Sequence, residues 1–169
     1  MTPLISKEEI ARRISEVASD LDKLYAGKEL VIVAIMKGSI CLAADLIRAL
    51  KNPKVCLECI HASSYGKHGI VPGELYVQES KLPIEGKHVL LIDDIFDSGR
   101  TLTSVAAQLQ KQNPASLKTL VLLDKGKSSL PSPNYVLFSI EDEFVIGYGL
   151  DYKECYRGLS GIYIFKEML

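Results

Sequence analysis

Residues 89–101 read VLLIDDIFDSGRT, an apolar run that passes directly into two adjacent acids and then into a small, hydroxyl-rich turn. The run at 89–92 has the pattern of a strand that is covered on both faces. In an open parallel sheet, ligands bind outside the carboxyl ends of the strands, which is where Asp93 and Asp94 fall. Because adjacent carboxylates repel each other, their ionised forms need cations or hydroxyl donors nearby, and a sugar diol with Mg²⁺ supplies both.

The turn after these acids offers a site for an anion. Residues 97–101 bring several backbone N–H groups and two hydroxyls to the start of a helix that is expected from Leu102. Unpaired N–H groups and the positive end of the helix macrodipole favour a monophosphate there, and Gly99 lets the backbone approach it closely. A simpler interpretation makes Asp97 or Ser98 the N-cap of a helix, but it does not explain three aspartates within five residues.

Strand and helix patterns alternate over the rest of the chain. A capping box of Ser6 and Glu9 opens an amphipathic helix, and apolar runs predict strands. The predicted strands are 30–35, 55–62, 75–78, 88–92, 117–123, 135–140, 144–146 and 162–165, and the later helices are 40–50 and 102–110. This alternation predicts one α/β domain, with a mostly parallel twisted sheet flanked by helices over about 30–140 and a small hood lobe formed by the N-terminal helix and about 141–169.

Size and charge limit the possible partners. At 169 residues with 47% apolar content, the chain is long enough for a single domain with a full hydrophobic core. Its net charge of −1 gives no field that would collect nucleic acid or an anionic membrane, so neither is expected as a partner. Residues 1–9 do not read as a cleavable leader, and no later apolar run reaches membrane-spanning length, so we expect a cytoplasmic protein.

The chain has four cysteines, Cys41, Cys56, Cys59 and Cys155, in stretches that otherwise read as buried. In a reducing compartment such thiols behave as small hydrophobes. Cys56 and Cys59 have the spacing of a metal or redox motif, but they fall on a predicted strand, where positions three apart point to opposite faces. No second Cys/His pair completes a zinc set, so we expect neither a zinc site nor a disulfide.

The stretch 89–101 resembles the phosphoribosyl pyrophosphate motif of type I phosphoribosyltransferases: four apolar residues, two acids, two apolar residues, then Asp, Ser or Thr, Gly, any residue and Thr. The resemblance implies the type I phosphoribosyltransferase fold. It also implies that Asp93 and Asp94 bind the ribose hydroxyls. The 5-phosphate would be bound by Ser98, Gly99, Arg100 and Thr101. The first acid of the motif is usually Glu, so Asp93 is a shorter variant.

Further stretches resemble the hypoxanthine-guanine phosphoribosyltransferases. FVIGYGLDY at 144–152 with YRGL at 156–159 is similar to their C-terminal signature, and LLDK at 122–125 is similar to the strand end before it. The roles that this resemblance implies are stacking on the purine by Phe144, hydrogen bonding of its Watson–Crick edge by the Val145 backbone, donation to the 6-oxo group by Lys125, binding of Mg²⁺ beside the purine by Asp151 together with Asp93 and Asp94, and binding of pyrophosphate by Arg157.

These implied roles agree with simple chemistry. An aromatic face suits a flat heterocycle, and an ammonium suits a carbonyl oxygen while rejecting the 6-amino group of adenine. Taken alone, Phe144 in an apolar run would more often be a core residue, and Lys125 after a strand would more often be solvated. The shared order of the motifs favours the functional interpretation.

Two loops complete the resemblance. Met36-Lys37-Gly38-Ser39 resembles the family's pyrophosphate loop, in which Lys37 and Gly38 would bind pyrophosphate and the peptide before the Lys is often cis. SSYG at 63–66 resembles the start of the family's mobile lid, which would extend over 63–73 with Ser64 and Tyr65 as its contact residues. The family usually continues with Ser-Thr-Gly, whereas this chain reads HGIVPG at 68–73.

The resemblance implies a purine salvage transferase that makes IMP or GMP from hypoxanthine or guanine and phosphoribosyl pyrophosphate, with Mg²⁺ as cofactor and release of pyrophosphate. Asp97 lies between the ribose acids and the phosphate turn, and we interpret it as the catalytic general base at purine N7. A homodimer or homotetramer is expected, because isologous pairing is the commonest assembly.

Three alternatives remain. The chain could transfer to another base such as xanthine, because the purine 2-position is expected to be read by backbone groups. It could be a nucleotide-sensing, RNA-binding regulator with the same fold, although its near-neutral charge argues against this. A signalling receiver domain also has paired acids and a late Lys, but its acids follow the first strand, with a single phosphoacceptor Asp after a middle one.

Overall fold

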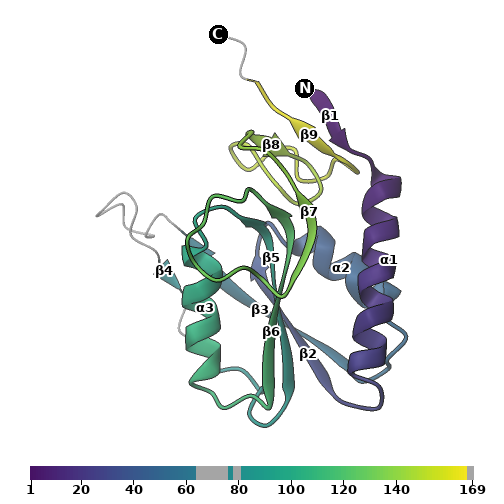
Figure 1. Cartoon of the computed structure of the whole chain (residues 1–169), viewed down its shortest axis with the longest axis vertical. Coiled ribbons are helices and arrows are strands. Elements are labelled where there is room, and N and C mark those ends of the chain that lie inside the picture. Colours follow the sequence, from purple (N-terminus) through teal and green to yellow (C-terminus); the bar gives the residue numbers. More distant parts are fainter. Residues whose placement is uncertain (64–75, 78–80, 167–169) are drawn as a thin grey trace.

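A computed structural model of the chain describes residues 1–63, 76–77 and 81–166 (Figure 1). Within these ranges a main sheet has the strand order β4-β3-β2-β5-β6-β7, and a small sheet has the order β1-β9-β8. The elements are β1 (Thr2–Ile5), α1 (Lys7–Leu24), β2 (Leu30–Met36), α2 (Ile40–Ala49), β3 (Val55–Ser63), β4 (Tyr76–Val77), β5 (His88–Phe96), α3 (Arg100–Gln110), β6 (Ser116–Asp124), β7 (Tyr135–Ser139), β8 (Val145–Ile146) and β9 (Ile162–Ile164).

The main sheet reverses its order between β2 and β5. From β2 the chain passes outward to β3, and it then returns across β2 to place β5 on the other side, in register from Leu30 opposite His88 to Ala34 opposite Ile92. These pairs are parallel, as are β5 with β6 and β6 with β7, whereas β4 runs antiparallel to β3. Loops that follow β2 and β5 therefore leave in opposite directions, and the crevice between them is where sheets of this kind bind ligands.

Helices cover both faces of the main sheet. Figure 1 shows α1 and α2 on one side and α3 on the other. Alternate residues along the strands supply the two cores, so that Ile32 and Leu90 join the side of α1 and α2 while Val33 and Leu91 join the side of α3. All four are fully buried, and each such side chain stabilises the fold by about 1.5–3 kcal/mol. Within the described ranges, no helix is long and apolar enough to cross a membrane.

The predicted mostly parallel, helix-flanked sheet is confirmed, but β5 is longer than predicted. The expected strand end at Ile92 was wrong, because pairing with β6 continues through Asp93 opposite Val121 to Phe96 opposite Asp124. The two acids therefore belong to the strand itself. Pairing with β6 keeps them in an extended conformation. A run of apolar residues does not predict this, because the run ends at the first charged residue.

The small sheet joins the two ends of the chain. Its strand β1 was not predicted, and it pairs with β9, with Thr2 opposite Ile164. Helix α1 lies along the main sheet, where the Arg13 guanidinium donates to the carbonyls of Leu137 (3.1 Å) and Val136 (3.3 Å) on β7. The N-terminus thus gives the small sheet a strand, while α1 covers the large one.

The cysteines are free, as expected, but most of them are not buried. Cys56, Cys59 and Cys155 are exposed, and Cys41 is half-buried, so the expectation of four buried thiols was wrong. Cys56 and Cys59 lie on β3, and in the described residues β4 pairs only with the last two residues of β3, Ala62 and Ser63. These two thiols are exposed because β3 lies near the edge of the sheet. The apolar composition of β3 does not predict that position.

Candidate active site

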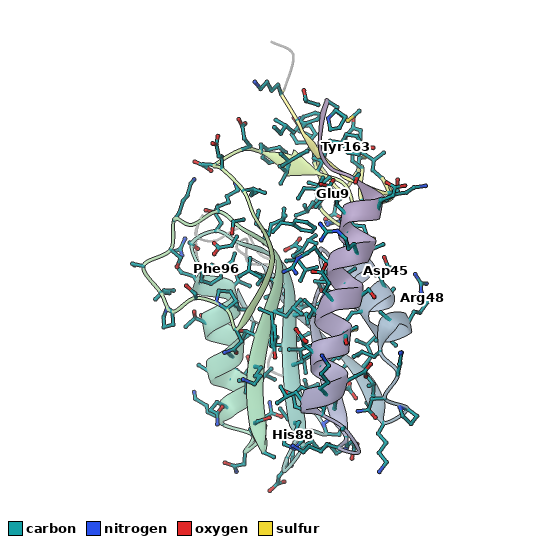
Figure 2. The ribbon with its side chains drawn as sticks, turned by 45° about the vertical axis from the view of Figure 1, so that its right-hand side comes forward. Glu9, Asp45, Arg48, His88, Phe96 and Tyr163 are labelled. Carbon is teal, nitrogen blue, oxygen red and sulfur yellow. The ribbon has the colours of Figure 1, made fainter. Side chains whose placement is uncertain are left out.

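Those predicted site residues that the structure describes gather at one end of the main sheet. Figure 2 labels both ends of β5, and the Phe96 end is the one that faces the small sheet, which carries Tyr163, while His88 lies at the opposite end. The carboxyl ends of the parallel strands therefore face the small sheet. The site expected at the β2–β5 reversal therefore lies at the end of the main sheet that faces the small sheet.

The acid pair, Asp93 and Asp94, lies near the carboxyl end of strand β5. Asp93 is buried, with 6% of its surface exposed, and Asp94 is half-buried. The Asp94 backbone N–H donates to Asp93 Oδ1 at 2.9 Å. Burial raises the pKa of both carboxyls, and that of Asp93 lies well above its usual value, with the neighbouring charge of Asp94 as a further cause. Such a pair favours ligands that bring hydroxyl donors or a cation.

Two glycines let three segments meet beside Asp94. A Cβ on Gly38 would lie 1.6 Å from Asp94 Oδ2, and a Cβ on Gly149 would lie 2.0 Å from the Gly38 carbonyl oxygen. The peptide between Met36 and Lys37 is cis. The loop after β2, the end of β5 and the 147–150 turn are therefore in contact, at a distance that no side chain would permit.

Both predicted pyrophosphate cations reach this junction. Lys37 Nζ lies 3.0 Å from Glu154 Oε2, and Arg157 NH2 lies 3.3 Å from the same oxygen. Arg157 also contacts Asp151 Oδ1 at 2.8 Å and donates to the Gly149 carbonyl at 2.7 Å. Lys37, Glu154, Arg157 and Asp151 thus form a small, charge-balanced network in which Lys37 contacts Glu154, although Lys37 is far from the other three in sequence.

The turn after β5 is built for an anion. Gly99 is the N-cap of α3 with φ 75°, the N–H of Arg100 donates to Ser98 Oγ at a long 3.4 Å, and the first turn contains no acid. A Cβ on Gly99 would meet Ser128 Oγ at 2.6 Å, and that hydroxyl donates to the Ser98 carbonyl at 3.0 Å. The simpler interpretation of Asp97 or Ser98 as the N-cap is therefore wrong. Both residues are exposed, and the first turn of α3 contains no carboxylate that would offset the positive end of the helix.

The expected purine residues lie on the far side of the same end. Only 11% of the Lys125 side chain is exposed, and its Nζ lies 3.3 Å from Asp142 Oδ1, while Lys127 contacts the other oxygen of that carboxylate. Phe144 is 51% exposed and meets Tyr152 edge-on, with ring centroids 5.9 Å apart. The simpler interpretations, of Lys125 as a solvated side chain and of Phe144 as a core residue, are therefore both wrong. Val145, the next residue, is buried in the small sheet opposite Ile164.

Sequence reasoning did not find three polar residues of this site, namely Asp142, Glu154 and Ser128. Glu154 lies three positions after Asp151 and three before Arg157, so its spacing inside the C-terminal signature was the available signal. The predicted phosphate residues Arg100 and Thr101 form the first turn of α3. The predicted lid residues Ser64 and Tyr65 lie outside the described residues.

In the part of the chain that the structure describes, no group of three or more His, Cys, Asp or Glu side chains could hold a metal ion. Asp151 keeps one oxygen on Arg157 and the other on the Glu154 backbone N–H at 2.9 Å. Magnesium commonly takes one or two carboxylates and completes its shell with water and substrate phosphates. These donors fit an ion that arrives with a ligand better than a cage made by the protein alone.

Comparisons with known proteins match nearly the whole chain. The family model described as "Phosphoribosyl transferase domain" matches residues 4–153. The hypoxanthine-guanine phosphoribosyltransferase of Aquifex aeolicus is 38% identical over 97% of this chain and 94% of its own length, and that of Dictyostelium discoideum is 40% identical over 97% and 94%. Among solved structures, a hypoxanthine-guanine phosphoribosyltransferase from Bacillus anthracis superposes with a TM-score of 0.89 at 37% identity, covering 98% of this chain and 99% of that one. A variant of the hypoxanthine phosphoribosyltransferase from Trypanosoma cruzi, in a ternary complex with substrates, gives 0.87 at 39%, covering 98% and 95%.

Proposed function

This chain belongs to the phosphoribosyl transferase domain family, among the hypoxanthine-guanine phosphoribosyltransferases, and we propose that it joins hypoxanthine or guanine to the ribose 5-phosphate of phosphoribosyl pyrophosphate. The products are IMP or GMP and pyrophosphate, so the reaction salvages free purine bases. The enzyme acts in the cytoplasm, as a homodimer or homotetramer.

One observation carries the proposal: the loop of Lys37 and Gly38 touches the carboxylate of Asp94. In phosphoribosyl pyrophosphate, the pyrophosphate on C1 is next to the 2-hydroxyl, and the 5-phosphate is at the other end of the ribose. A site for this molecule must therefore set an anion-binding loop directly against diol-binding acids. A second anion site must follow within one sugar length, and the turn between β5 and α3 is the candidate for it.

The order of groups along the crevice gives the binding mode. Lys37 and Arg157 hold the pyrophosphate, and Asp93 and Asp94 accept hydrogen bonds from the ribose hydroxyls. Residues 98–101 wrap the 5-phosphate with backbone N–H groups at the positive end of α3. Support comes from the bare start of α3, whose first turn carries no acid that would compete with a phosphate.

At the other end of the sugar, Phe144 stacks on the purine and the Val145 backbone meets its Watson–Crick edge. Lys125 donates to the 6-oxo oxygen, and its low exposure supports this role because a buried ammonium discriminates strongly between an acceptor and an amino group. Adenine, which presents a donor at this position, is rejected.

The chemistry replaces pyrophosphate at ribose C1 by a purine nitrogen, and positive charge develops on the sugar in the transition state. Asp97, exposed one residue beyond β5, takes the proton from purine N7 as the new bond forms and steadies the cationic ribose. Lys37 and Arg157 offset the negative charge that gathers on the departing pyrophosphate. Asp151, together with Asp93 and Asp94, would hold Mg²⁺, which would supply further positive charge to the departing group.

The test is release of pyrophosphate from phosphoribosyl pyrophosphate with each of four bases: hypoxanthine, guanine, xanthine and adenine. Release with the first two and not with adenine is expected, and it should be lost when Mg²⁺ is removed by a chelator. Preference for xanthine would move the assignment to another base within the same family. No release with any 6-oxopurine would refute the proposed activity.

Replacement of Lys125 tests base recognition. Lys125→Ala should lower the ratio of kcat/KM for hypoxanthine over adenine by at least about tenfold, because the only buried donor to the 6-oxo group is gone in the proposed mode. Lys127→Ala is the matched control, since Lys127 shares the Asp142 carboxylate but is 41% exposed, against 11% for Lys125. An unchanged ratio in Lys125→Ala would remove Lys125 from base recognition.

A further inference from the structure

Glu154 occupies the space between two cations that the proposed function assigns to pyrophosphate. One oxygen, Oε2, lies 3.0 Å from Lys37 Nζ and 3.3 Å from Arg157 NH2. A glutamate with as much exposed surface as Glu154 is an anion at neutral pH, and both of its partners are cations. An anionic oxygen between an ammonium and a guanidinium reproduces the contacts that a phosphate oxygen would make.

The backbone holds this carboxylate in place through an unusual turn. Tyr152 and Cys155 exchange both backbone hydrogen bonds, at 3.1 and 3.0 Å, so Lys153 and Glu154 form a two-residue hairpin turn. Both have positive φ, 51° and 63°, the conformation of a type I′ turn that normally selects Asn, Asp or Gly. Two bulky residues in this conformation are a local cost, and such outliers concentrate at functional sites.

Asp151 couples this turn to the rest of the site. Its Oδ2 accepts from the Glu154 backbone N–H at 2.9 Å, and its Oδ1 pairs with Arg157 at 2.8 Å. The network of Lys37, Asp151, Glu154 and Arg157 therefore carries two positive and two negative groups. A pyrophosphate that binds both cations would bring its negative charge against the Glu154 carboxylate, which already contacts the Lys37 ammonium and one Arg157 nitrogen, so the two anions compete for the same cations.

We propose that Glu154 is an internal competitor for pyrophosphate: its carboxylate holds Lys37 and Arg157 together while the site is empty, is displaced when phosphoribosyl pyrophosphate binds, and returns to expel the pyrophosphate product. The inference rests on the proposed function and assigns a positioning residue for the leaving-group site. Its ion pairs are exposed, with 65% of the Glu154 side chain accessible, so displacement requires little energy.

The experiment measures binding of inorganic pyrophosphate with Mg²⁺ to the full chain by titration calorimetry. Glu154→Gln should tighten pyrophosphate binding by about threefold to tenfold, the range that loss of one or two exposed ion-pair competitors allows. In steady state the same variant should show a lower KM for phosphoribosyl pyrophosphate together with a lower kcat, because product release becomes slower. A purely structural role would not lower both.

Two further variants test this interpretation, one that also removes the carboxylate and one that serves as a control. Glu154→Gly lacks the carboxylate and suits the positive φ, so it should fold and tighten binding in the same direction. Glu29→Gln is the matched control, because Glu29 also pairs with a lysine, Lys87 at 2.7 Å, at the opposite end of the sheet, and it should leave pyrophosphate affinity unchanged.

The outcomes distinguish failure of the Glu154 proposal from failure of the proposed function. Unchanged or weaker binding in both Glu154 variants, with measurable binding in the parent, would overturn the competitor role and leave the proposed function standing. Absence of pyrophosphate binding in the parent itself would count against the assignment of Lys37 and Arg157 and therefore against the proposed function.

Discussion

At the scale of single residues, Asp93, which we propose as a ribose ligand, lowers the stability of the fold at neutral pH. Its carboxyl is buried beside Asp94, and burial, with the adjacent charge, raises its pKa well above the usual value. A raised carboxyl pKa means that the folded state holds the proton more tightly than the unfolded chain. Stability from this group is present in acid, below the unfolded pKa of about 3.9, and is lost as pH rises through the folded value.

Asp93→Asn should therefore raise the free energy of unfolding at pH 7 while it abolishes turnover. The amide keeps the Oδ1 acceptor for the Asp94 N–H and never ionises. Denaturant titrations of parent and variant between pH 7 and pH 4 should show the gain shrink as the pH falls. Asp20→Asn, at an exposed helix position, is the control and should stay within about 0.5 kcal/mol of the parent. A gain that does not vary with pH would contradict the explanation.

Asp97 makes the opposite case, because it is exposed and its loss should not affect folding. Asp97→Asn should lower kcat by about 10²- to 10⁴-fold with saturating substrates, the usual contribution of a general base, while the KM for phosphoribosyl pyrophosphate stays within about threefold. Single-turnover kinetics with hypoxanthine separate the chemical step from product release. Nearly full turnover in this variant would exclude Asp97 as the base.

Much of the residue-scale site could be predicted because its members follow strand ends in a recognisable order. Lys37, Asp94 and Arg157 come together as the motifs imply. Glu154 and Asp142 were missed because an ion pair depends on the tertiary position of both partners. Neither carboxylate has a local pattern that distinguishes it from a solvated acid.

At the scale of elements, local signals sufficed where they were complete. The capping box of α1 is present, with the Ser6 N–H donating to Glu9 Oε2 at 2.8 Å and the Glu9 N–H donating to Ser6 Oγ at 3.2 Å. Strand β1 had no comparable signal, because four residues that include Pro3 become a strand only through pairing with β9. Short edge strands depend on their partner more than on their own propensity.

The contact between α1 and β7 gives a prediction at this scale. Arg13→Ala should lower the free energy of unfolding by about 2 kcal/mol, because a charged donor to two strand carbonyls at 3.1 and 3.3 Å is lost. Arg12→Ala is the control on the same helix; Arg12 pairs only at the surface with Glu16, at 2.9 Å, and its loss should cost at most about 0.5 kcal/mol. Equal losses in urea titrations would show that Arg13 does not anchor the helix to β7.

At the scale of the molecule, the alternation of strands and helices predicts the parallel sheet, and the general right-handedness of its crossovers restricts the strand order. It does not predict how the two sheets face each other. That arrangement depends on β1 and β9, from opposite ends of the chain, and on the approach of Gly149 to the Gly38 carbonyl. Such a contact is visible only when both loops are in place.

Gly149→Ala should therefore push the small sheet away from the crevice. The new Cβ would lie 2.0 Å from the Gly38 carbonyl oxygen, at a residue with φ 99°. Because both the clash and the strain involve the backbone, no change of side-chain rotamer relieves them. We expect a loss of about 2–4 kcal/mol in unfolding free energy and at least a tenfold lower kcat/KM, because Arg157 donates to the Gly149 carbonyl and would move with it. Gly158→Ala is the matched control in the same lobe, since its Cβ would meet nothing within 4 Å, and both stability and turnover should be retained. If Gly149→Ala behaved like Gly158→Ala in melting and kinetic measurements, the close contact between the two loops would not hold the sheets in position.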